Sequence, residues 1–402
     1  MAPATPFDPI FNLLILITFI ALLARRFRLP YTVVLVFVGL LIPLFPSFNL
    51  PELSPEFFMT LLLPPIVFEA AYRLDVSSMM KEADVVLSYA FVGTILSTFL
   101  IAGAAYFILH FSLIESLLLG IITSPTDPVA VISTFRRLGI SERFSLIIEG
   151  EALFNDGVAI VLYSALLTAS KTGSLEGLPL AKEIIYSIVS ASLIGALSGY
   201  LVFWMMRLSE DRFVHSLLTF LSAMGIYRIV ESEFIGASGV IAVVASGLVT
   251  RYMINERGGL TEESKSFLDV FWEFIAFITT SIAFLFIGLY LDLDLLWAYF
   301  LAILASIAVI LGARRLMIYF LAELLRRIRK KELPQSWQNG LTWAGLRGAV
   351  SVVLSLGVMN LPLDHGSEIL AISFGVVLFS LLFQGLTINF VVRKLGLAPR
   401  ED

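Results

Sequence analysis

The sequence predicts an all-α membrane protein with thirteen transmembrane helices, and three observations support this fold class. Hydrophobic residues make up 58% of the 402 residues, charged residues make up only 15%, and the mean hydropathy is +0.92. A soluble chain carries roughly 25% charged residues, so lipid must solvate much of this apolar excess. Apolar segments of spanning length also recur along the whole chain. Finally, positively charged residues (lysine and arginine) are concentrated in every second loop between these segments.

Each predicted span is a predominantly apolar segment bounded by charges, prolines or polar clusters. The first span has no basic stretch before it and no small-residue cleavage site after it, so it is expected to stay as a helix and not to be removed as a signal peptide. The second and third spans are short and interrupted by proline. The predicted spans are residues 9–24, 31–46, 57–72, 85–110, 113–134, 146–170, 182–206, 213–230, 234–252, 266–290, 295–325, 337–359 and 367–392.

The distribution of positive charge predicts the orientation of these spans. With the N-terminus outside, 21 of the 27 lysine and arginine residues fall on the cytoplasmic side and three fall on the outer side. The remaining three, Arg314, Arg315 and Arg347, fall inside predicted spans. Because positive charge concentrates in cytoplasmic loops, we expect a multi-pass protein of the cell membrane with an external N-terminus and a cytoplasmic C-terminus.

The chain is predicted to be a single transmembrane domain over residues 1–402. It contains no linker, low-complexity tract or soluble domain, and Arg400, Glu401 and Asp402 follow just after the last span, so no cytoplasmic tail is expected. Cysteine is absent, which excludes disulfides and cysteine-ligated metals. The net charge of −5 is small, and we expect membrane lipid and no nucleic acid among the partners.

Two predicted spans are expected to be broken in mid-membrane. In the fifth span, prolines flank Thr126 and Asp127, remove backbone donors and disfavour helix at the residue before each. In the twelfth, Gly345 and Gly348 flank Arg347 in a run that continues to Ser351. The two spans are seven apart, which fits two inverted six-helix repeats, spans one to six and eight to thirteen, joined by span seven. Interrupted helices in matching positions indicate a transport site and free carbonyl oxygens for a cation.

Several carboxylates lie at membrane depth, where each ionisable group costs roughly 2.5–3.5 kcal/mol to insert. In the sixth span, Glu151 and Asn155 share a helix face and Asp156 lies beside Asn155. Any one carboxylate can be a paired, structural charge. The cationic side chains at depth are too few to neutralise all of the carboxylates. At least one carboxylate is therefore left for a transported ion or a proton. These carboxylates are Glu69, Asp127, Glu149, Glu151, Asp156 and Glu273.

These segments resemble a known family. The segments that carry the resemblance run from Thr126 to Pro128, from Glu151 to Asp156, from Gly345 to Val350, from Leu63 to Ala70 and from Phe271 to Glu273. They are similar to the sodium/proton antiporters of the monovalent cation:proton antiporter superfamily, in its Asn-Asp branch. The resemblance implies a homodimer. A core domain, about residues 57–170 and 266–392, is expected to move against a dimerisation domain, about 1–50 and 182–252.

The resemblance also implies roles for the residues of the cation site. Asp156 resembles the essential carboxylate that binds either the cation or the proton. Thr126 and Asp127 resemble the crossover of unwound segments, where Thr126 would offer its backbone carbonyl. Asn155 would orient the site.

Two further roles implied by the resemblance are structural. Glu151 resembles the carboxylate that pairs with an arginine of the eleventh span, and the motif there assigns that arginine as Arg314 rather than Arg315. Arg347 would neutralise helix ends at the second crossover.

One residue departs from the family pattern. Some relatives have Ser where this chain has Ala152, so water or Glu69 is expected to complete the oxygen ligands. Hard cations prefer carboxylate and carbonyl oxygens, and a desolvated carboxylate favours its protonated form, so a cation and a proton would compete for Asp156. We therefore expect exchange of Na+ (or Li+) for H+, with Na+ as transported substrate and no cofactor. Since no lysine lies at depth in any span, one-for-one, electroneutral exchange is expected.

Three alternative functions are compared with the same residues. A K+/H+ antiporter would have the same site residues, whereas a channel would need no titratable carboxylate. The run Gly236-Ala-Ser238-Gly239 also matches the nucleophile motif of rhomboid intramembrane serine proteases. Such a protease needs an embedded histidine, and the histidine that follows, His365, falls in a predicted outer loop. The chain is therefore expected not to be an enzyme.

Overall fold

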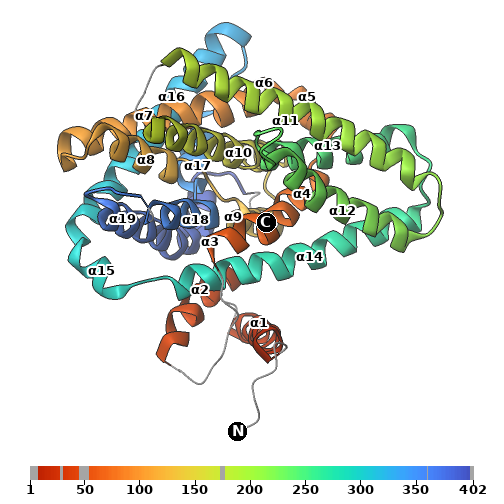
Figure 1. The fold of residues 1–402 in the computed structure, drawn as a ribbon, viewed down its shortest axis with the longest axis horizontal. Helices are drawn as coiled ribbons and strands as arrows, with labels where there is room; N and C mark the ends of the chain where they lie inside the picture. Colours follow the sequence, from red (N-terminus) through yellow and green to blue (C-terminus); the bar gives the residue numbers. More distant parts are fainter. Residues whose placement is uncertain (1–7, 28–29, 45–53, 173–176, 360, 399–402) are drawn as a thin grey trace.

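The computed structural model describes residues 8–27, 30–44, 54–172, 177–359 and 361–398, and every element within them is helical (Figure 1). The prediction of an all-α membrane protein is confirmed. Seven helical stretches of the described residues are long and apolar enough to cross a membrane, and the bent pair of α17 (Gln335–Ala344) and α18 (Ala349–Val358) adds an eighth. The seven are Ala83–Leu109, Glu142–Ser170, Gly177–Met206, Arg212–Glu231, Glu262–Leu289, Phe300–Arg329 and Gly366–Lys394.

In chain order the helices are α1 (Asp8–Phe27), α2 (Tyr31–Leu41), η1 (Ile42–Leu44), α3 (Pro55–Phe57), η2 (Phe58–Leu62), α4 (Leu63–Arg73), α5 (Val76–Lys81), α6 (Ala83–Leu87), η3 (Ser88–Gly93), α7 (Thr94–Ala104), η4 (Ala105–Leu109), α8 (Leu113–Thr123), α9 (Val129–Leu138), α10 (Glu142–Thr172), α11 (Gly177–Met206), α12 (Arg212–Glu231), α13 (Gly239–Arg257), α14 (Glu262–Leu289), α15 (Leu293–Ala298), α16 (Phe300–Arg329), α17 (Gln335–Ala344), α18 (Ala349–Val358), α19 (Gly366–Phe379), η5 (Ser380–Gly385) and α20 (Leu386–Lys394).

Each of the thirteen predicted spans overlaps one or more of these helices, but the number of membrane crossings stays a prediction. One difference in a boundary is at the ninth span, where α13 begins at Gly239 and not at residue 234. Gly236 there has a left-handed backbone, and Ser238 caps the helix by accepting a hydrogen bond from the Ile241 amide (3.3 Å). Positions 45 and 46 of the second span and residues 400–402 lie outside the described residues.

Short π-helical turns interrupt several helices, and the sequence analysis did not predict them. They are η2, η3, η4 and η5. The first, η2, leads directly into Pro64 and Pro65 of α4. Because proline has no amide hydrogen, the regular hydrogen-bond ladder cannot run through these two positions, and the preceding turn widens.

Very close helix packing joins α2 to α14. A Cβ atom on Gly39 would lie 2.3 Å from the Leu285 carbonyl oxygen, and one on Gly288 would lie 2.0 Å from the Val36 carbonyl oxygen. Only glycine permits such an approach, which is typical of small-residue contacts between membrane helices.

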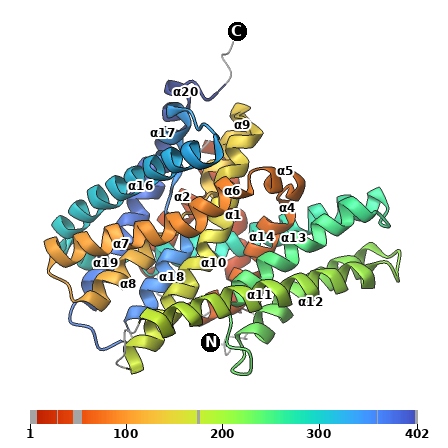
Figure 2. The ribbon, with the colours of Figure 1, turned by 90° about the horizontal axis from the view of Figure 1, so that it is seen from above.

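Helix α10 occupies a central position between two groups of helices. α11, α12 and α13 pack together on one side, while α7, α8, α16 and α19 pack together on the other (Figures 1 and 2). α10 contacts α8 as well as α11 and α13. The segment from Glu151 to Asp156 is therefore placed in the middle of the molecule.

Candidate functional site

The two predicted helix breaks are both present, and they contact each other. The first separates α8 from α9 over residues 124–128, and the second separates α17 from α18 over residues 345–348 with a bend of 48°. The Asp127 amide donates to the Leu346 carbonyl oxygen at 2.8 Å. Unwound backbone at this depth thus finds partners in the opposite break, as buried backbone requires.

Arg347 connects the second break to the end of α8. Its Nη1 atom donates to the carbonyl oxygens of Ser124 and Pro125, the latter at 2.9 Å, and its side chain is buried. The last carbonyls of a helix have no partner within it and carry partial negative charge. A guanidinium at this position satisfies them and offsets that charge.

Asp127 lies at the start of α9. Its Oδ1 atom accepts a hydrogen bond from the Val129 amide at 2.9 Å, at the helix end that carries partial positive charge. Gly348 makes room for this carboxylate, because a Cβ atom at position 348 would lie 2.1 Å from Asp127 Oδ2. The glycine of one break therefore sets the position of the carboxylate in the other.

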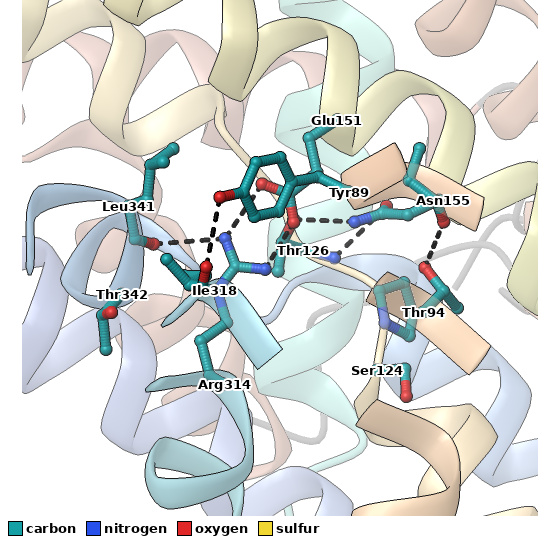
Figure 3. A network of polar contacts seen from close by, with 12 residues as sticks. Tyr89, Thr94, Ser124, Thr126, Glu151, Asn155, Arg314, Ile318, Leu341 and Thr342 are labelled. Atoms are coloured by element: carbon teal, nitrogen blue, oxygen red, sulfur yellow. Dashed lines mark hydrogen bonds and ion pairs between the residues drawn. The ribbon is translucent and has the colours of Figure 1, made fainter. Parts of the chain in front are cut away.

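Asn155 connects α10 to the first break through two hydrogen bonds with Thr126. Its Nδ2 atom donates to Thr126 Oγ1 at 2.8 Å, and its Oδ1 atom accepts from the Thr126 amide at 3.4 Å (Figure 3). Both residues are buried. The Thr126 hydroxyl is thus engaged by Asn155.

A buried ion pair joins α10 to α16. Arg314 donates from Nη1 and Nη2 to the two carboxylate oxygens of Glu151, and from Nη2 to the Leu341 carbonyl oxygen at 3.1 Å (Figure 3). The Arg314 and Glu151 side chains are 4% and 2% exposed. The neighbouring Arg315 instead donates to Asn339 at 2.9 Å on the exposed face.

Asp127 and Asp156 line a common cavity of about 290 Å³, together with Glu69, Thr126 and Ser351. No lysine or arginine of the described residues forms an ion pair with either aspartate, whereas Glu69, Glu149, Glu151 and Glu273 are all paired. The excess of negative charge expected at depth is therefore concentrated on two carboxylates that face one hollow.

Ion pairs line one end of this cavity. Glu69 pairs with Arg73 at 2.6 Å, and Arg73 also reaches Glu273 at 3.0 Å. Arg136 pairs with Glu149 at 3.5 Å, and the Arg136 side chain is 59% exposed. The cavity thus extends from Asp156 to a charged rim at the protein surface. Glu69 and Arg73 are four residues apart on one helix face, a spacing in the sequence that would have indicated this pair.

Two other lining residues bear on which oxygen atoms the cavity offers, besides the hydroxyl residues Ser133 and Thr280. Ala152 faces it and offers no side-chain oxygen. Ser351 faces it from the first turn of α18 with a hydroxyl that has no hydrogen-bond partner among the described residues. Ser351 falls at membrane depth in the sequence, but no local signal distinguishes it from other hydroxyl residues there.

The residues of the protease motif have other, structural contacts. Ser238 caps α13, and its amide donates to Ser187 Oγ at 3.0 Å. His365 contacts Glu115 through Nδ1 at 3.1 Å and stacks on Phe111. These separate partners give no support to a serine–histidine pair.

Comparison with known proteins identifies relatives that are cation/proton antiporters. The family model described as "Sodium/hydrogen exchanger, transmembrane" matches residues 13–394. The Na+/H+ antiporter ApNhaP of Aphanothece halophytica is 37% identical over 373 residues, covering 92% of this chain and 70% of the relative. The Na+/H+ antiporter NhaH of Halobacillus aidingensis is 34% identical over 408 residues, covering 96% of each.

A solved structure has the same fold. The sodium proton antiporter MjNhaP1 of Methanocaldococcus jannaschii, determined at pH 8, matches with a TM-score of 0.80, covering 96% of this chain and 97% of that one. The two sequences are 20% identical, so this likeness concerns the fold.

Proposed function

The chain belongs to the sodium/hydrogen exchanger family, and from this premise we propose that it exchanges Na+ for H+ across a membrane by letting both ions compete for Asp156. One observation carries the assignment of the site. Asp156 and Asp127 face a single cavity at the meeting of two helix breaks, without an ion-pair partner among the described residues. Such a site needs a cation or a proton to offset its charge.

The proposed competition follows from the chemistry of a carboxylate. Na+ is a hard cation that prefers carboxylate and carbonyl oxygens, and the same oxygens bind a proton. An uncompensated charge crosses a region of low dielectric only at high cost, whereas the proton-loaded or Na+-loaded site is neutralised. Exchange results if only loaded sites change the side to which they are open.

The surrounding residues have supporting roles in this proposal. Asn155 holds Thr126 so that the backbone carbonyl of Thr126 and the carboxylates can act as ligands. Arg347 stabilises the end of α8, and the pair of Glu151 and Arg314 fixes α10 against α16. Glu69, which lines the same cavity and pairs with Arg73, serves as a further cation contact on the way to Asp156.

Two cavities on α10 support alternating access. The first holds Asp156 and extends to Arg136, in a predicted cytoplasmic loop. A second, of about 530 Å³, is lined by Tyr163, Glu231 and Gly357. Tyr163 lies two helical turns, about 10 Å, beyond Asp156 on α10. We assign the first cavity to the cytoplasmic side and the second to the outer side.

The wider architecture is proposed on the same basis. Thirteen spans with an external N-terminus and a cytoplasmic C-terminus, in two inverted repeats, account for the alternating positive charge and for the paired breaks. A core domain, about 57–170 and 266–392, moves against a dimerisation domain, about 1–50 and 182–252, in a homodimer of the cell membrane. K+ in place of Na+ (or Li+) is the second candidate substrate, because the same oxygens bind each of these cations.

The test is exchange by purified protein in liposomes, with Na+, Li+ and K+ supplied separately. Asp156→Asn should abolish exchange for every cation, because the amide can neither carry a charge nor hold the proton. Asp294→Asn, at an exposed site on α15, is the matched control and should keep the wild-type rate. Exchange by a folded Asp156→Asn protein near the wild-type rate would contradict the site. Exchange of K+ alone by the wild type would favour the second candidate.

A further inference from the structure

Ser351 differs from most buried hydroxyl residues of this protein. It is the third residue of α18, its relative exposure is 2%, and its Oγ atom has no hydrogen-bond partner among the described residues. It lines the cavity that holds Asp127 and Asp156. Burying a hydroxyl without a hydrogen-bond partner costs free energy, so the presence of one here needs a physical reason.

The helix break explains why the hydroxyl is free. Buried hydroxyls in intact helices donate to a carbonyl three or four residues earlier, as Thr94 does to Ala90, Thr123 to Leu119 and Ser373 to Ile369. For Ser351 those carbonyls belong to Gly348 and Arg347, which lie in the break. Because these two residues are not helical, the Ser351 hydroxyl is left without the backbone partner that an intact helix would give it, in a residue that lines the cavity.

The residues around it define what a ligand would find there. Asp127 Oδ1 accepts from the Val129 amide, Thr126 Oγ1 accepts from Asn155, and Glu69 pairs with Arg73. Ala152 contributes no oxygen. Ser133 and Thr280 also bring hydroxyl groups to the lining, and Ser351 adds a buried hydroxyl that has no hydrogen-bond partner among the described residues.

We propose that the Ser351 hydroxyl oxygen is a neutral ligand of the transported cation and contributes to the choice among monovalent cations. The proposal rests on the function proposed above and adds a residue from α18 to the site on α10. A neutral oxygen adds a bond to the cation without adding charge, so the balance between the proton-loaded and cation-loaded forms is kept. Since Na+ accepts more oxygen ligands than the smaller Li+, loss of one oxygen should weaken Na+ binding more.

The experiment compares Ser351→Ala, Ser351→Thr and Ser355→Ala with the wild type in liposomes. Ser355 is the matched control, because it is buried one turn further along α18 and its hydroxyl already donates to the Val352 carbonyl at 2.7 Å. We expect Ser351→Ala to raise KM for Na+ about tenfold, a loss typical of one bond to a charged group, with kcat nearly kept. The KM for Li+ should rise less, Ser351→Thr should keep KM near that of the wild type, and Ser355→Ala should not change it.

A binding measurement separates this inference from the function on which it rests. Na+ that binds the folded protein raises its melting temperature, and the Na+ concentration needed should increase in Ser351→Ala by the same factor as KM. If Ser351→Ala binds and exchanges Na+ like the wild type while Asp156→Asn is inactive, Ser351 is not a ligand and the proposed function stands. If the wild type does not exchange Na+ at all, the proposed function fails first.

A second variant decides the matter if Ser351→Ala does not fold. Ser351→Cys is nearly isosteric, and it replaces a hard oxygen by a sulfur that Na+ disfavours. The same rise in KM is expected for this variant. An unchanged KM in folded Ser351→Cys protein would overturn the proposal.

Discussion

Adjacent arginines of α16 have opposite environments. Arg314 points into the protein, where it holds both oxygens of Glu151 and the Leu341 carbonyl, whereas Arg315 lies on the exposed face with Asn339. Removing one partner of a buried ion pair costs about 3–5 kcal/mol, because the remaining charge is left uncompensated. An exposed pair contributes only about 0–1 kcal/mol.

These magnitudes give a prediction at the scale of single residues. Arg314→Ala should lower the melting temperature in detergent clearly more than Arg326→Ala, because the loss of the Arg314 guanidinium leaves Glu151 buried and unpaired. Arg326 is the control, since it pairs with Glu323 on an exposed part of the same helix. Thermal unfolding followed by size-exclusion chromatography measures the difference. Equal melting temperatures would contradict a stabilising role for the Arg314–Glu151 pair.

The sequence predicted some residues of the site and could not predict others. Asp127, Asp156 and Glu151 stood out because charge at membrane depth is costly and needs a reason. Ser351 did not, because hydroxyl residues are common in membrane helices and usually bond to their own backbone. Its exceptional state depends on the exact position of a break, which the sequence locates only within several residues.

At the scale of elements, local chemistry predicted where helices break but not what the breaks contact. Prolines around Thr126 and Asp127 and glycines around Arg347 were sufficient to place both interruptions. The contact of Asp127 with Leu346 joins residues more than 200 positions apart, and no local pattern encodes it. The π-helical turn η2 precedes two prolines, but no proline directly follows η3, η4 or η5, and no local pattern predicted these three turns.

The contact between the two helix breaks can be tested at Gly348. In Gly348→Ala, the new Cβ atom would lie 2.1 Å from Asp127 Oδ2, so the carboxylate or the break must move. We expect at least about a tenfold loss of exchange, because a displacement of this kind at a site can cost that much or more. Gly312→Ala on α16 is the control, since a Cβ atom there meets nothing within 4 Å.

The comparison uses exchange rate and melting temperature together. Gly312→Ala should keep the rate and keep or raise the melting temperature, as alanine is a better helix former than glycine. Wild-type exchange by Gly348→Ala would mean that the carboxylate can relocate at no cost, and the proposed coupling between the two breaks would then be wrong.

At the scale of the whole molecule, composition alone established the membrane environment, and the alternation of positive charge predicted the orientation. The number of crossings is harder to derive from helix length and hydropathy. α2 and α8 are short for a span, and the third predicted span is divided between α3, η2 and α4. Such elements depend on packing against neighbours, as at Gly39 and Gly288, and not on apolar length.

The charge moved in each cycle is also a property of the whole molecule. If Asp156 alone alternates between one proton and one Na+, the loaded carrier has the same net charge in both directions. Asp127 could add a second proton, but its carboxylate caps α9 through the Val129 amide and packs against Gly348. Partial positive charge at that helix end favours a negatively charged cap. No described lysine pairs with either aspartate to supply another proton.

We therefore predict electroneutral, one-for-one exchange. A membrane potential of either sign, imposed on Na+-loaded liposomes, should leave the initial rate nearly unchanged, because no net charge crosses the membrane. Liposomes with protein carrying Asp156→Asn report the background leak under the same potential. A several-fold acceleration under one sign of potential would contradict one-for-one exchange. It would indicate that Asp127 leaves its capping position during the cycle and carries a second proton.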